Sequence, residues 1–256
     1  MNITTTKPLS SLSVFYPAYN DEGSIRPLVE KTLQLLPALT DDFEIIVVND
    51  GSRDNTPAIL DAMARELPHM RVVHHPANRG YGGALRTGLL TATKDWVFYT
   101  DGDAQYDVNE LRDLVALVRD DLDVVNGYKL KRSDHRRRIV LGGIYKRLSR
   151  ALFALPIRDV DCDFRLMRRA VIQSIDLRST SGVVCTEMIY KLAQAGARFV
   201  ETPVHHYPRM HGQSQFFNWR SVVKTATDFF ALWLRLVVWP RVSFGLWGPR
   251  KPVLKS

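Results

Sequence analysis

Two carboxylates, two residues apart, follow an apolar segment near the middle of the chain. Asp101 and Asp103 flank Gly102 directly after the run Trp96–Thr100, and Gln105 lies two residues further on. Glycine permits a tight turn, so both carboxylates and the amide oxygen can converge on one hard cation. A solvated turn is the alternative for an isolated Asp-x-Asp pair. Its position after a predicted strand favours a Mg²⁺ or Mn²⁺ site, a kind of site that commonly bridges to substrate phosphates.

A second polar cluster, Asn49-Asp50-Gly51-Ser52, follows the apolar run 43–48. The Asp50 carboxylate can accept a hydrogen bond from an N–H group of a nucleobase. The alternative is ordinary turn chemistry at a strand end, with Asp54 as the N-cap of the next helix. Both interpretations can hold together, because they use different residues.

Two further loops carry groups that suit anions. Residues 78–83 read Asn-Arg-Gly-Tyr-Gly-Gly before a predicted helix, and glycines there let backbone N–H groups approach a phosphate. No Gly-Lys-Ser/Thr follows, so this is not a P-loop, and a plain tight turn fits equally well. Arg209 has the planar donor fork that binds phosphate with two hydrogen bonds, or it is a surface arginine.

The elements that must position these groups alternate between strand and helix. Buried strands are predicted at 12–16, 43–48, 71–75 and 96–100, with helices near 24–36, 55–66 and 84–93 between them. This alternation predicts an α/β fold with a doubly wound, mostly parallel, Rossmann-like sheet. Ligands bind such sheets at the carboxyl ends of the strands, where the polar clusters lie.

The second half of the chain is less regular. It predicts strands at 123–128 and 199–206 and helices at 139–155, 164–175, 186–195 and 219–239. We expect one domain over residues 1–217 and a C-terminal amphipathic helix and tail over 218–256. His205 and His206 alternate on a strand without metal-ligand spacing, so we interpret them as structural.

Charge divides the chain into two unlike halves. Residues 1–127 carry 11 basic and 19 acidic side chains, a net charge of −8, whereas residues 128–256 carry 24 and 8, a net charge of +16. Residues 128–150 alone hold nine basic residues and one aspartate. A solvated basic helix or a nucleic-acid arm is the alternative, but no nucleic-acid-binding motif accompanies the charge. We therefore expect a phosphate or an anionic lipid, and no nucleic acid, as its partner.

Composition excludes several other classes. Apolar residues make up 45% and charged residues 24% of the chain, as in soluble globular proteins. Two cysteines, Cys162 and Cys185, cannot form a disulfide framework. The first residues lack a signal-peptide pattern, and the longest apolar run, 229–239, is short and contains Arg235. We expect a cytoplasmic protein.

Five motifs occur in an order that resembles a known family. They are Pro17-Ala18-Tyr19-Asn20-Asp21-Glu22, Asn49-Asp50-Gly51-Ser52, Asn78-Arg79-Gly80, Asp101-Gly102-Asp103-Ala104-Gln105 and Arg209-x-x-Gly212-x-Ser214. Together they resemble the inverting family 2 glycosyltransferases of the GT-A fold, and within them the dolichyl- or polyprenyl-phosphate sugar synthases. The resemblance covers about residues 11–217.

This resemblance implies roles for the matching positions. For nucleotide-sugar binding it implies Pro17, Ala18, Tyr19, Asp21, Asp50, Arg79, Gly80, Asp101, Gly102 and Arg209. For the metal it implies Asp101, Asp103 and Gln105, and for catalysis Asp103 and Asp163, with Asp159 and Asp161 as weaker candidates for the base. For the acceptor phosphate it implies Lys129, Arg132, Arg137, Arg138 and Ser214.

The implied reaction moves a sugar from GDP-mannose or a UDP-sugar to a polyprenyl or dolichyl phosphate, with Mg²⁺ or Mn²⁺. The lipid phosphate is already anionic, so no strong base is required; a sugar or polysaccharide hydroxyl acceptor would instead need a base such as Asp163. A non-catalytic nucleotide-sugar-binding subunit is the third alternative. The protein would lie at the cytoplasmic face of a membrane, on the bilayer or on a membrane subunit.

Some positions depart from the family pattern. Asp21 stands where glutamate is usual, Asn49 where aspartate is usual, and Lys129 where arginine is common. Many relatives continue into two membrane helices, whereas residues 218–256 offer an apolar set that either meets a bilayer or packs on the core or a partner: Phe229, Phe230, Leu232, Trp233, Leu236, Val237 and Trp239. Arg235, Arg241, Arg250 and Lys251 would then meet anionic head groups.

Overall fold

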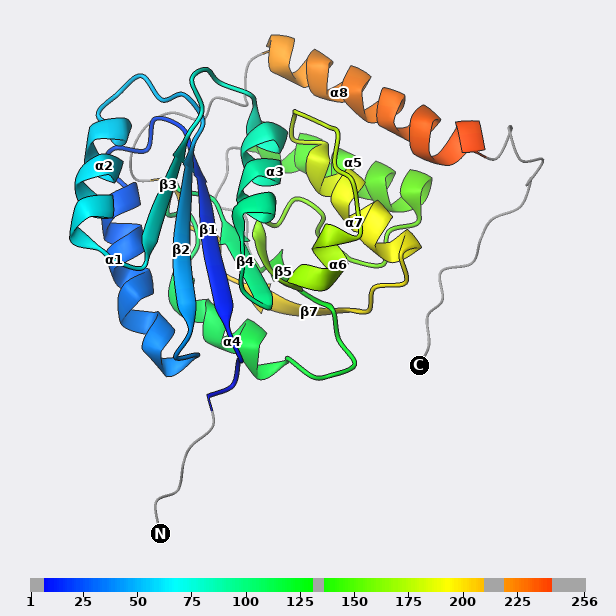
Figure 1. The fold of residues 1–256 in the computed structure, drawn as a ribbon. Coiled ribbons are helices and arrows are strands. Elements are labelled where there is room, and N and C mark those ends of the chain that lie inside the picture. Colours follow the sequence, from blue (N-terminus) through cyan, green and yellow to red (C-terminus); the bar gives the residue numbers. More distant parts are fainter. Residues whose placement is uncertain (1–6, 131–135, 210–218, 241–256) are drawn as a thin grey trace.

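The computed structural model describes residues 7–130, 136–209 and 219–240, with side chains except at 136–140 and 219–221. Its centre is a seven-stranded sheet in the order β3-β2-β1-β4-β6-β5-β7 (Figure 1). The strands are β1 Leu12–Ala18, β2 Phe43–Asn49, β3 Met70–His74, β4 Trp96–Thr100, β5 Val124–Lys129, β6 Phe164–Arg168 and β7 Phe199–Val204. β6 runs antiparallel to β4 and β5, and the other neighbouring strands are parallel.

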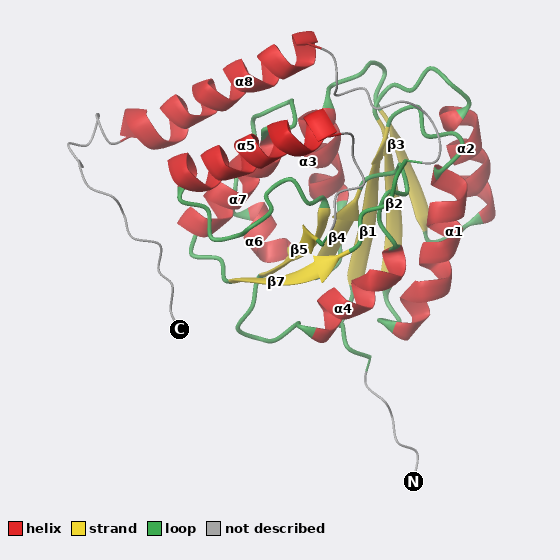
Figure 2. Cartoon of the chain, turned by 180° about the vertical axis from the view of Figure 1, so that it is seen from behind, coloured by secondary structure: helices red, strands yellow, loops and turns green. Residues whose placement is uncertain are grey.

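Helices cover both faces of this sheet. They are α1 Ile25–Leu35, α2 Thr56–Glu66, α3 Tyr81–Thr91, α4 Leu111–Ala116, α5 Arg136–Phe153, α6 Arg169–Gln173, α7 Val184–Gln194 and α8 Trp219–Trp233. Short 3₁₀ turns occupy Leu36–Ala38 and Val108–Glu110, and a π-helical turn, Leu234–Val238, continues α8. Figure 2 shows the helices from behind, with α8 lying along the same end of the molecule as α5.

Alternate residues of the central strand serve two separate cores. In β1, Val14 and Tyr16 pack in one cluster with side chains of α1, α2 and α4. Phe15 points to the other face and packs in a second cluster with α3, α5, α6, α7 and α8. Since both faces are covered, the central strands are apolar almost throughout, which explains why the sequence revealed them.

One predicted element is wrong. The helix expected over 164–175 is strand β6 followed by the short helix α6. Phe164 and Leu166 enter one core cluster and Met167 enters the other, which is the alternation of a strand. The sequence hid this alternation because a charged residue, Arg165, occupies a position with no exposed surface.

Two helices also differ in detail from expectation. The N-cap of α2 is Asn55 rather than Asp54, although an Asp54 oxygen accepts a hydrogen bond from the Thr56 N–H at 3.0 Å. The last predicted helix, 219–239, is present over its whole length, but Leu234–Val238 form a π-helical turn within it. The other predicted helices and strands are present, with ends that differ by a few residues.

Helix α8 packs on the body of the molecule through one side. Phe229 lies with its ring centroid 5.2 Å from that of Tyr145 and 5.4 Å from that of Phe153, both on α5. The Trp233 indole N–H donates to the Leu152 carbonyl at 3.2 Å. Phe229, Leu232 and Val237 are therefore core residues rather than a membrane face.

Arg235 differs from its expected role at head groups. Its guanidinium lies 3.0 Å from the carboxylate of Glu187, whose side chain has no exposed surface. This ion pair fastens the end of α8 to α7. Among the described residues, no helix has both the length and the apolar character that crossing a bilayer requires.

Candidate active site

The strand directions bring the polar loops to one edge of the sheet. β1, β2 and β4 are parallel, so the loops after Ala18, Asn49 and Thr100 lie at their shared carboxyl edge. β6 is antiparallel, and its first residue, Phe164, pairs with Thr100. This register places Asp163, just before β6, beside Asp101, just after β4. The sequence could not anticipate this pairing, because it predicted no strand there.

Asp101 is the most crowded carboxylate of this edge. The Tyr81 hydroxyl donates to one Asp101 oxygen at 2.9 Å. Burial raises the pKa of Asp101 well above its usual range, and the charges of Asp163 and Asp103 raise it further. Three carboxylates within electrostatic reach of one another create an excess of negative charge that a cation would offset.

Asp103 meets the arginine that the sequence singled out. The Arg209 guanidinium donates to a single oxygen of Asp103, from Nη2 at 2.7 Å and from Nε at 3.3 Å. Burial alone lowers the pKa of Arg209, but the Asp103 carboxylate outweighs it and the pKa is raised. The other Asp103 oxygen accepts the backbone N–H of Gln105 at 3.1 Å.

The donor set fits a divalent cation that also binds phosphate. Within the described ranges, no three His, Cys, Asp or Glu side chains are gathered closely enough to enclose a metal by themselves. Mg²⁺ and Mn²⁺ commonly take one or two carboxylates and complete their shell with water and substrate phosphate oxygens. Asp101 and Asp103 supply such a pair, and the crowding of negative charge at Asp101 supports it.

Gln105 joins the loop after β4 to the segment that carries Arg209. Its side-chain amide donates to the Tyr207 carbonyl at 3.0 Å, and the Tyr207 N–H donates back to the Gln105 carbonyl at 2.8 Å. The amide N–H group is thus used to position the chain near Arg209. That the Gln105 oxygen binds the metal remains a prediction.

The loop after β1 touches the loop after β4. The Gly102 N–H donates to the Pro17 carbonyl at 3.2 Å, and the Tyr19 N–H donates to an Asp21 oxygen at 2.9 Å. A side chain at position 102 would come within 3.0 Å of the Pro17 carbonyl, so glycine keeps the loops close. Burial raises the pKa of Asp21 to about 6.

Asp50 is fixed by two donors, His75 and Arg79, of which the sequence had assigned only Arg79 to the site. Its Oδ1 lies 2.6 Å from Nδ1 of His75 and accepts the Arg79 N–H at 2.8 Å. The Arg79 side chain is exposed, and that it binds the nucleotide-sugar remains a prediction. The neighbouring Asn49, where the family usually has aspartate, hydrogen-bonds the His74 ring at 2.8 Å.

The glycine turn of residues 80–83 closes against the loop before α7. Gly80 has φ +78°, and a Cβ there would meet the Thr180 carbonyl oxygen at 2.5 Å. The Gly82 N–H donates to that same carbonyl at 2.9 Å. This close contact positions Tyr81, and with it the hydrogen bond to Asp101. The sequence singled out residues 78–83 for their glycines and did not assign Tyr81 to the site. The position of Tyr81 within this motif is the signal that could have identified it.

Asp163 is the best placed of the three aspartates in 159–163. One of its oxygens accepts from the Tyr99 hydroxyl at 3.4 Å and from the Cys185 thiol at 3.1 Å. Asp159, in contrast, is fully buried and lies 3.2 Å from the Lys146 ammonium. We therefore retain Asp163 as the candidate base and assign Asp159 to structure.

A buried arginine, Arg165, is linked to Asp163 through the Tyr99 hydroxyl. Arg165 donates to the Tyr99 hydroxyl at 2.5 Å and also to Asn126 and to the carbonyls of Val160 and Cys162. These bonds hold the segment that leads into β6. Sequence reasoning missed Arg165, because a charged residue gives no sign that its position is buried.

The predicted acceptor-phosphate residues are only partly described. The Lys129 ammonium, at the end of β5, donates to the Asp161 carbonyl. Arg132 and Ser214 lie outside the described residues. Arg137 and Arg138 lie in α5, but their side chains are outside the described part. Binding of an acceptor phosphate by these residues remains a prediction.

Comparison with known proteins agrees with this architecture. Residues 13–176 match the model of the family described as Glycosyl transferase family 2. The glycosyltransferase AglD of Haloferax volcanii is 32% identical over 243 residues, 91% of this chain. The undecaprenyl-phosphate 4-deoxy-4-formamido-L-arabinose transferase of Shewanella sediminis is 30% identical over 80% of the chain. The chain spans 38% and 61% of the lengths of these two relatives.

Solved structures share the fold. The mannosyltransferase PcManGT of Pyrobaculum calidifontis, in complex with GDP-Man and Mn²⁺, aligns with a TM-score of 0.64 at 22% identity, covering 90% of this chain and 66% of that one. Glucosyl-3-phosphoglycerate synthase of Mycobacterium tuberculosis, in complex with UDP, aligns with the same score at 20% identity, covering 88% and 79%. The predicted GT-A fold is confirmed. On the match over residues 13–176, the chain belongs to glycosyl transferase family 2.

Proposed function

We propose that this protein transfers a sugar from a nucleoside-diphosphate sugar to the phosphate of a polyprenyl lipid, with a divalent cation at Asp101 and Asp103. The observation that carries the proposal is the meeting of these two carboxylates with Arg209 at one edge of the sheet. The names of the relatives support the lipid class, since one is an undecaprenyl-phosphate sugar transferase. The solved mannosyltransferase with GDP-Man and Mn²⁺ supports the donor class and the metal.

The donor half of the site combines negative and positive groups. A cation between Asp101 and Asp103 would neutralise charge on the leaving diphosphate. Arg209 has a donor fork that suits a phosphate group as well as the Asp103 carboxylate it now contacts. When a diphosphate arrives, we expect the guanidinium to bind phosphate oxygens and so release Asp103 for the cation.

The acceptor half must bring a second phosphate close to the first. The excess of basic residues in 128–150 would reduce the repulsion between the two groups. A phosphate nucleophile needs no strong base, so Asp163 would help to orient the acceptor. A hydroxyl acceptor is the second candidate, favoured by the register that sets Asp163 beside Asp101, because Asp163 could then remove the proton.

A transfer assay tests the proposal. Purified protein with Mn²⁺ is offered a panel of GDP- and UDP-sugars together with a short-chain polyprenyl phosphate or with sugar acceptors. We expect product on the lipid phosphate, and a loss of at least about 100-fold in rate for Asp103→Asn, the size of effect seen when one charge-stabilising group is removed. Product on sugars alone would reject the lipid acceptor. An undiminished rate in Asp103→Asn would reject the metal role of Asp103, and no product with any acceptor would favour the non-catalytic binding subunit.

We further propose that the protein lies at the cytoplasmic face of a membrane, through the outer sides of α5 and α8. On α8 and the start of its π-helical continuation, Val223, Phe230 and Leu234 are about half exposed and are spaced by seven and four residues, which places them on one face. This face is distinct from the buried side that carries Phe229 and Leu232.

Helix α5 adds a second exposed apolar stripe next to basic side chains. Leu141, Ile144 and Leu148 are exposed at helical spacing, and Arg147 and Arg150 are exposed beside them. Apolar residues flanked by arginines suit the surface of an anionic bilayer.

Vesicle binding tests the membrane proposal. We expect the protein to sediment with vesicles that contain phosphatidylglycerol, and the double variant Phe230→Ser, Leu234→Ser to bind at least about tenfold more weakly, because each side chain contributes about 1.5–3 kcal/mol when buried. The control Thr227→Ser alters an exposed polar residue of the same helix. Equal binding by the double variant would place membrane contact elsewhere.

A further inference from the structure

A buried histidine, His75, contacts Asp50, the aspartate that we expect to bind the nucleobase of the donor. The His75 and Asp50 side chains are only 3% and 5% exposed, and Nδ1 of the ring lies 2.6 Å from Oδ1 of Asp50. On its other side, Nε2 lies 2.9 Å from the Thr87 hydroxyl on α3. The ring thus connects the loop after β2 to helix α3.

The donor of the hydrogen bond to Asp50 can be assigned. Oδ1 of Asp50 already accepts the Arg79 N–H at 2.8 Å, and an ionised carboxylate can only accept. Nδ1 of His75 must therefore carry the hydrogen of this bond. The Thr87 hydroxyl lies 2.9 Å from Nε2 and 3.0 Å from the Gly83 carbonyl, so it has hydrogen-bond partners on both sides.

This bonding determines which part of Asp50 can meet a ligand. His75 and the Arg79 N–H both bind Oδ1, so the plane of the carboxylate is held and Oδ2 is the oxygen that a ligand N–H can reach. Without the hydrogen bond from His75, the Asp50 carboxylate could rotate about its side-chain bonds, and Oδ2 would no longer have a fixed orientation.

We propose that His75 is a positioning residue that holds Asp50 as a fixed acceptor for the nucleobase of the donor. The inference rests on the proposed function, since it requires that Asp50 face the base. Uracil and guanine carry a ring N–H on the edge that pairs in nucleic acids, whereas cytosine and adenine carry an acceptor nitrogen there. A fixed acceptor therefore selects UDP- or GDP-sugars over CDP-sugars.

Two substitutions of His75 each keep one of its two hydrogen bonds and remove the other. In His75→Asn the amide nitrogen occupies the place of Nδ1 and can still donate to Asp50, while the contact with Thr87 is lost. In His75→Gln the amide lies near the place of Nε2, so Thr87 keeps its partner and the donor to Asp50 is lost. The pair thus distinguishes positioning of Asp50 from general packing of the buried ring.

Calorimetric titration of UDP, GDP and CDP with Mn²⁺ gives the readout. We expect His75→Gln to bind the preferred nucleotide about tenfold or more weakly and to discriminate less against CDP, as loss of a charge-assisted hydrogen bond implies. His75→Asn should bind within about threefold of wild type, because its hydrogen bond to Asp50 remains. Inorganic pyrophosphate with Mn²⁺, which lacks a base, should bind all three proteins alike.

Each other result contradicts the inference. Wild-type affinity and selectivity in His75→Gln, or equal losses in both variants, would make the ring a packing element. Weaker pyrophosphate binding would indicate general damage to the site. A wild-type protein that binds no nucleoside diphosphate would overturn the proposed function, and the role of His75 with it.

A measurement on the wild-type protein covers the case in which a variant fails to fold. With ¹⁵N-labelled histidine, we expect an NMR signal from the Nδ1–H group of His75. The Nδ1–H signal should shift on addition of UDP or GDP with Mg²⁺ and stay in place with pyrophosphate and Mg²⁺. No shift with a nucleotide that binds would contradict the proposal.

Discussion

At the scale of single residues, the site is organised by which donor meets each carboxylate. Asp103 has a guanidinium, Asp101 a tyrosine hydroxyl, Asp50 an imidazole, and Asp163 a hydroxyl and a thiol. Charged donors stabilise ionised carboxylates more than neutral donors do. Burial raises the pKa of Asp101 well above its usual range, its acidic neighbours raise it further, and the hydrogen bond from the neutral Tyr81 hydroxyl does not offset them.

Asp21 provides a prediction about pH and stability. Burial raises its pKa from 3.8 to about 6, so the folded state binds its proton more tightly than the unfolded state does. Stability from this group is present below the ordinary pKa and is lost as pH rises to about 6. Asp21→Asn removes the effect and, relative to wild type, should gain about 1–3 kcal/mol between pH 4 and pH 7.5.

Denaturant unfolding of both proteins in EDTA, at several pH values, measures this difference. EDTA removes divalent ions that would change the electrostatics of the neighbouring carboxylates. A gap in unfolding free energy that stays constant or narrows with rising pH would show that the Asp21 carboxyl is not destabilised by burial.

At the scale of elements, α3 and α8 are held to the core by close contacts. Phe15 of β1 stacks on Tyr99 of β4, with ring centroids 5.2 Å apart, and α3 lies over this pair through Gly88. Tyr99 in turn reaches Asp163. At α8, the pairing of Arg235 with Glu187 joins the helix to a carboxylate that also accepts the Ser179 N–H at 2.7 Å. Helix packing and the position of the site are therefore connected.

Two glycine substitutions in helices should have opposite effects. A Cβ at Gly88 would lie 2.3 Å from the Phe15 ring, so Gly88→Ala should destabilise the protein by about 1–3 kcal/mol through overpacking. A Cβ at Gly143 of α5 would meet nothing within 4 Å, so Gly143→Ala should stabilise by up to about 1 kcal/mol through helix propensity. Thermal unfolding of both variants measures the difference, and a shift of the same sign in both would contradict this packing.

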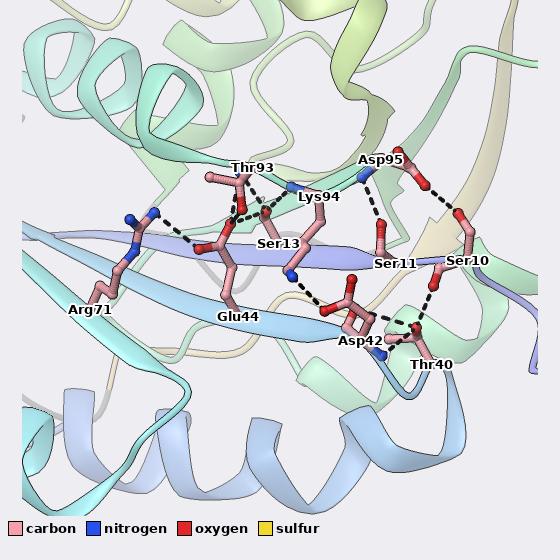
Figure 3. A network of polar contacts seen from close by, with 10 residues as sticks. All are labelled: Ser10, Ser11, Ser13, Thr40, Asp42, Glu44, Arg71, Thr93, Lys94 and Asp95. Atoms are coloured by element: carbon pink, nitrogen blue, oxygen red, sulfur yellow. Dashed lines mark hydrogen bonds and ion pairs between the residues drawn. The ribbon is translucent and has the colours of Figure 1, made fainter.

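At the scale of the whole molecule, the two edges of the sheet serve different purposes. The carboxyl edge holds the candidate active site, and the amino edge holds a polar network around Glu44 (Figure 3). Glu44 accepts hydrogen bonds from the Ser13 hydroxyl and from the Thr93 N–H and hydroxyl, each at 2.7 Å, and lies 3.0 Å from Arg71. This network joins β1, β2, β3 and the chain entering β4.

Glu44 should therefore contribute to stability and leave function unchanged. Burial by itself raises its pKa, but the bonds from Ser13 and Thr93 and the charge of Arg71 outweigh burial, so the pKa lies below its ordinary value of 4.5. We expect Glu44→Gln to cost about 1–3 kcal/mol at pH 7, and this cost should shrink as pH falls below 4.5.

Unfolding curves measured against pH test this, with nucleotide affinity at pH 7 as the control. The affinity should equal that of wild type, because the network lies at the opposite edge from the site. A weaker nucleotide affinity would mean that the two edges are coupled through the strands.

The parallel half of the fold and the motifs that follow its strands could be predicted from the amino-acid sequence alone. Strands that are buried on both faces consist of nearly continuous apolar runs in the sequence. Asp50, Asp101 and Asp103 lie just after such runs. These signals are local, so they can be read without knowing what each element packs against. The resemblance to family 2 rested on the same local motifs and is confirmed by the family match.

Contacts between residues that are far apart in the chain could not be predicted from the sequence and became known from the folded structure. The antiparallel insertion of β6 sets Asp163 beside Asp101, and its strand pattern was hidden because Arg165 is satisfied by partners far away in the chain. The ring of His75 acquires its role from Asp50 and Thr87, on two other elements. The two sides of α8 were distinguished in the same way, since its buried and exposed apolar residues are chemically alike. Strand order and packing depend on contacts between distant segments, which periodicity along the chain does not encode.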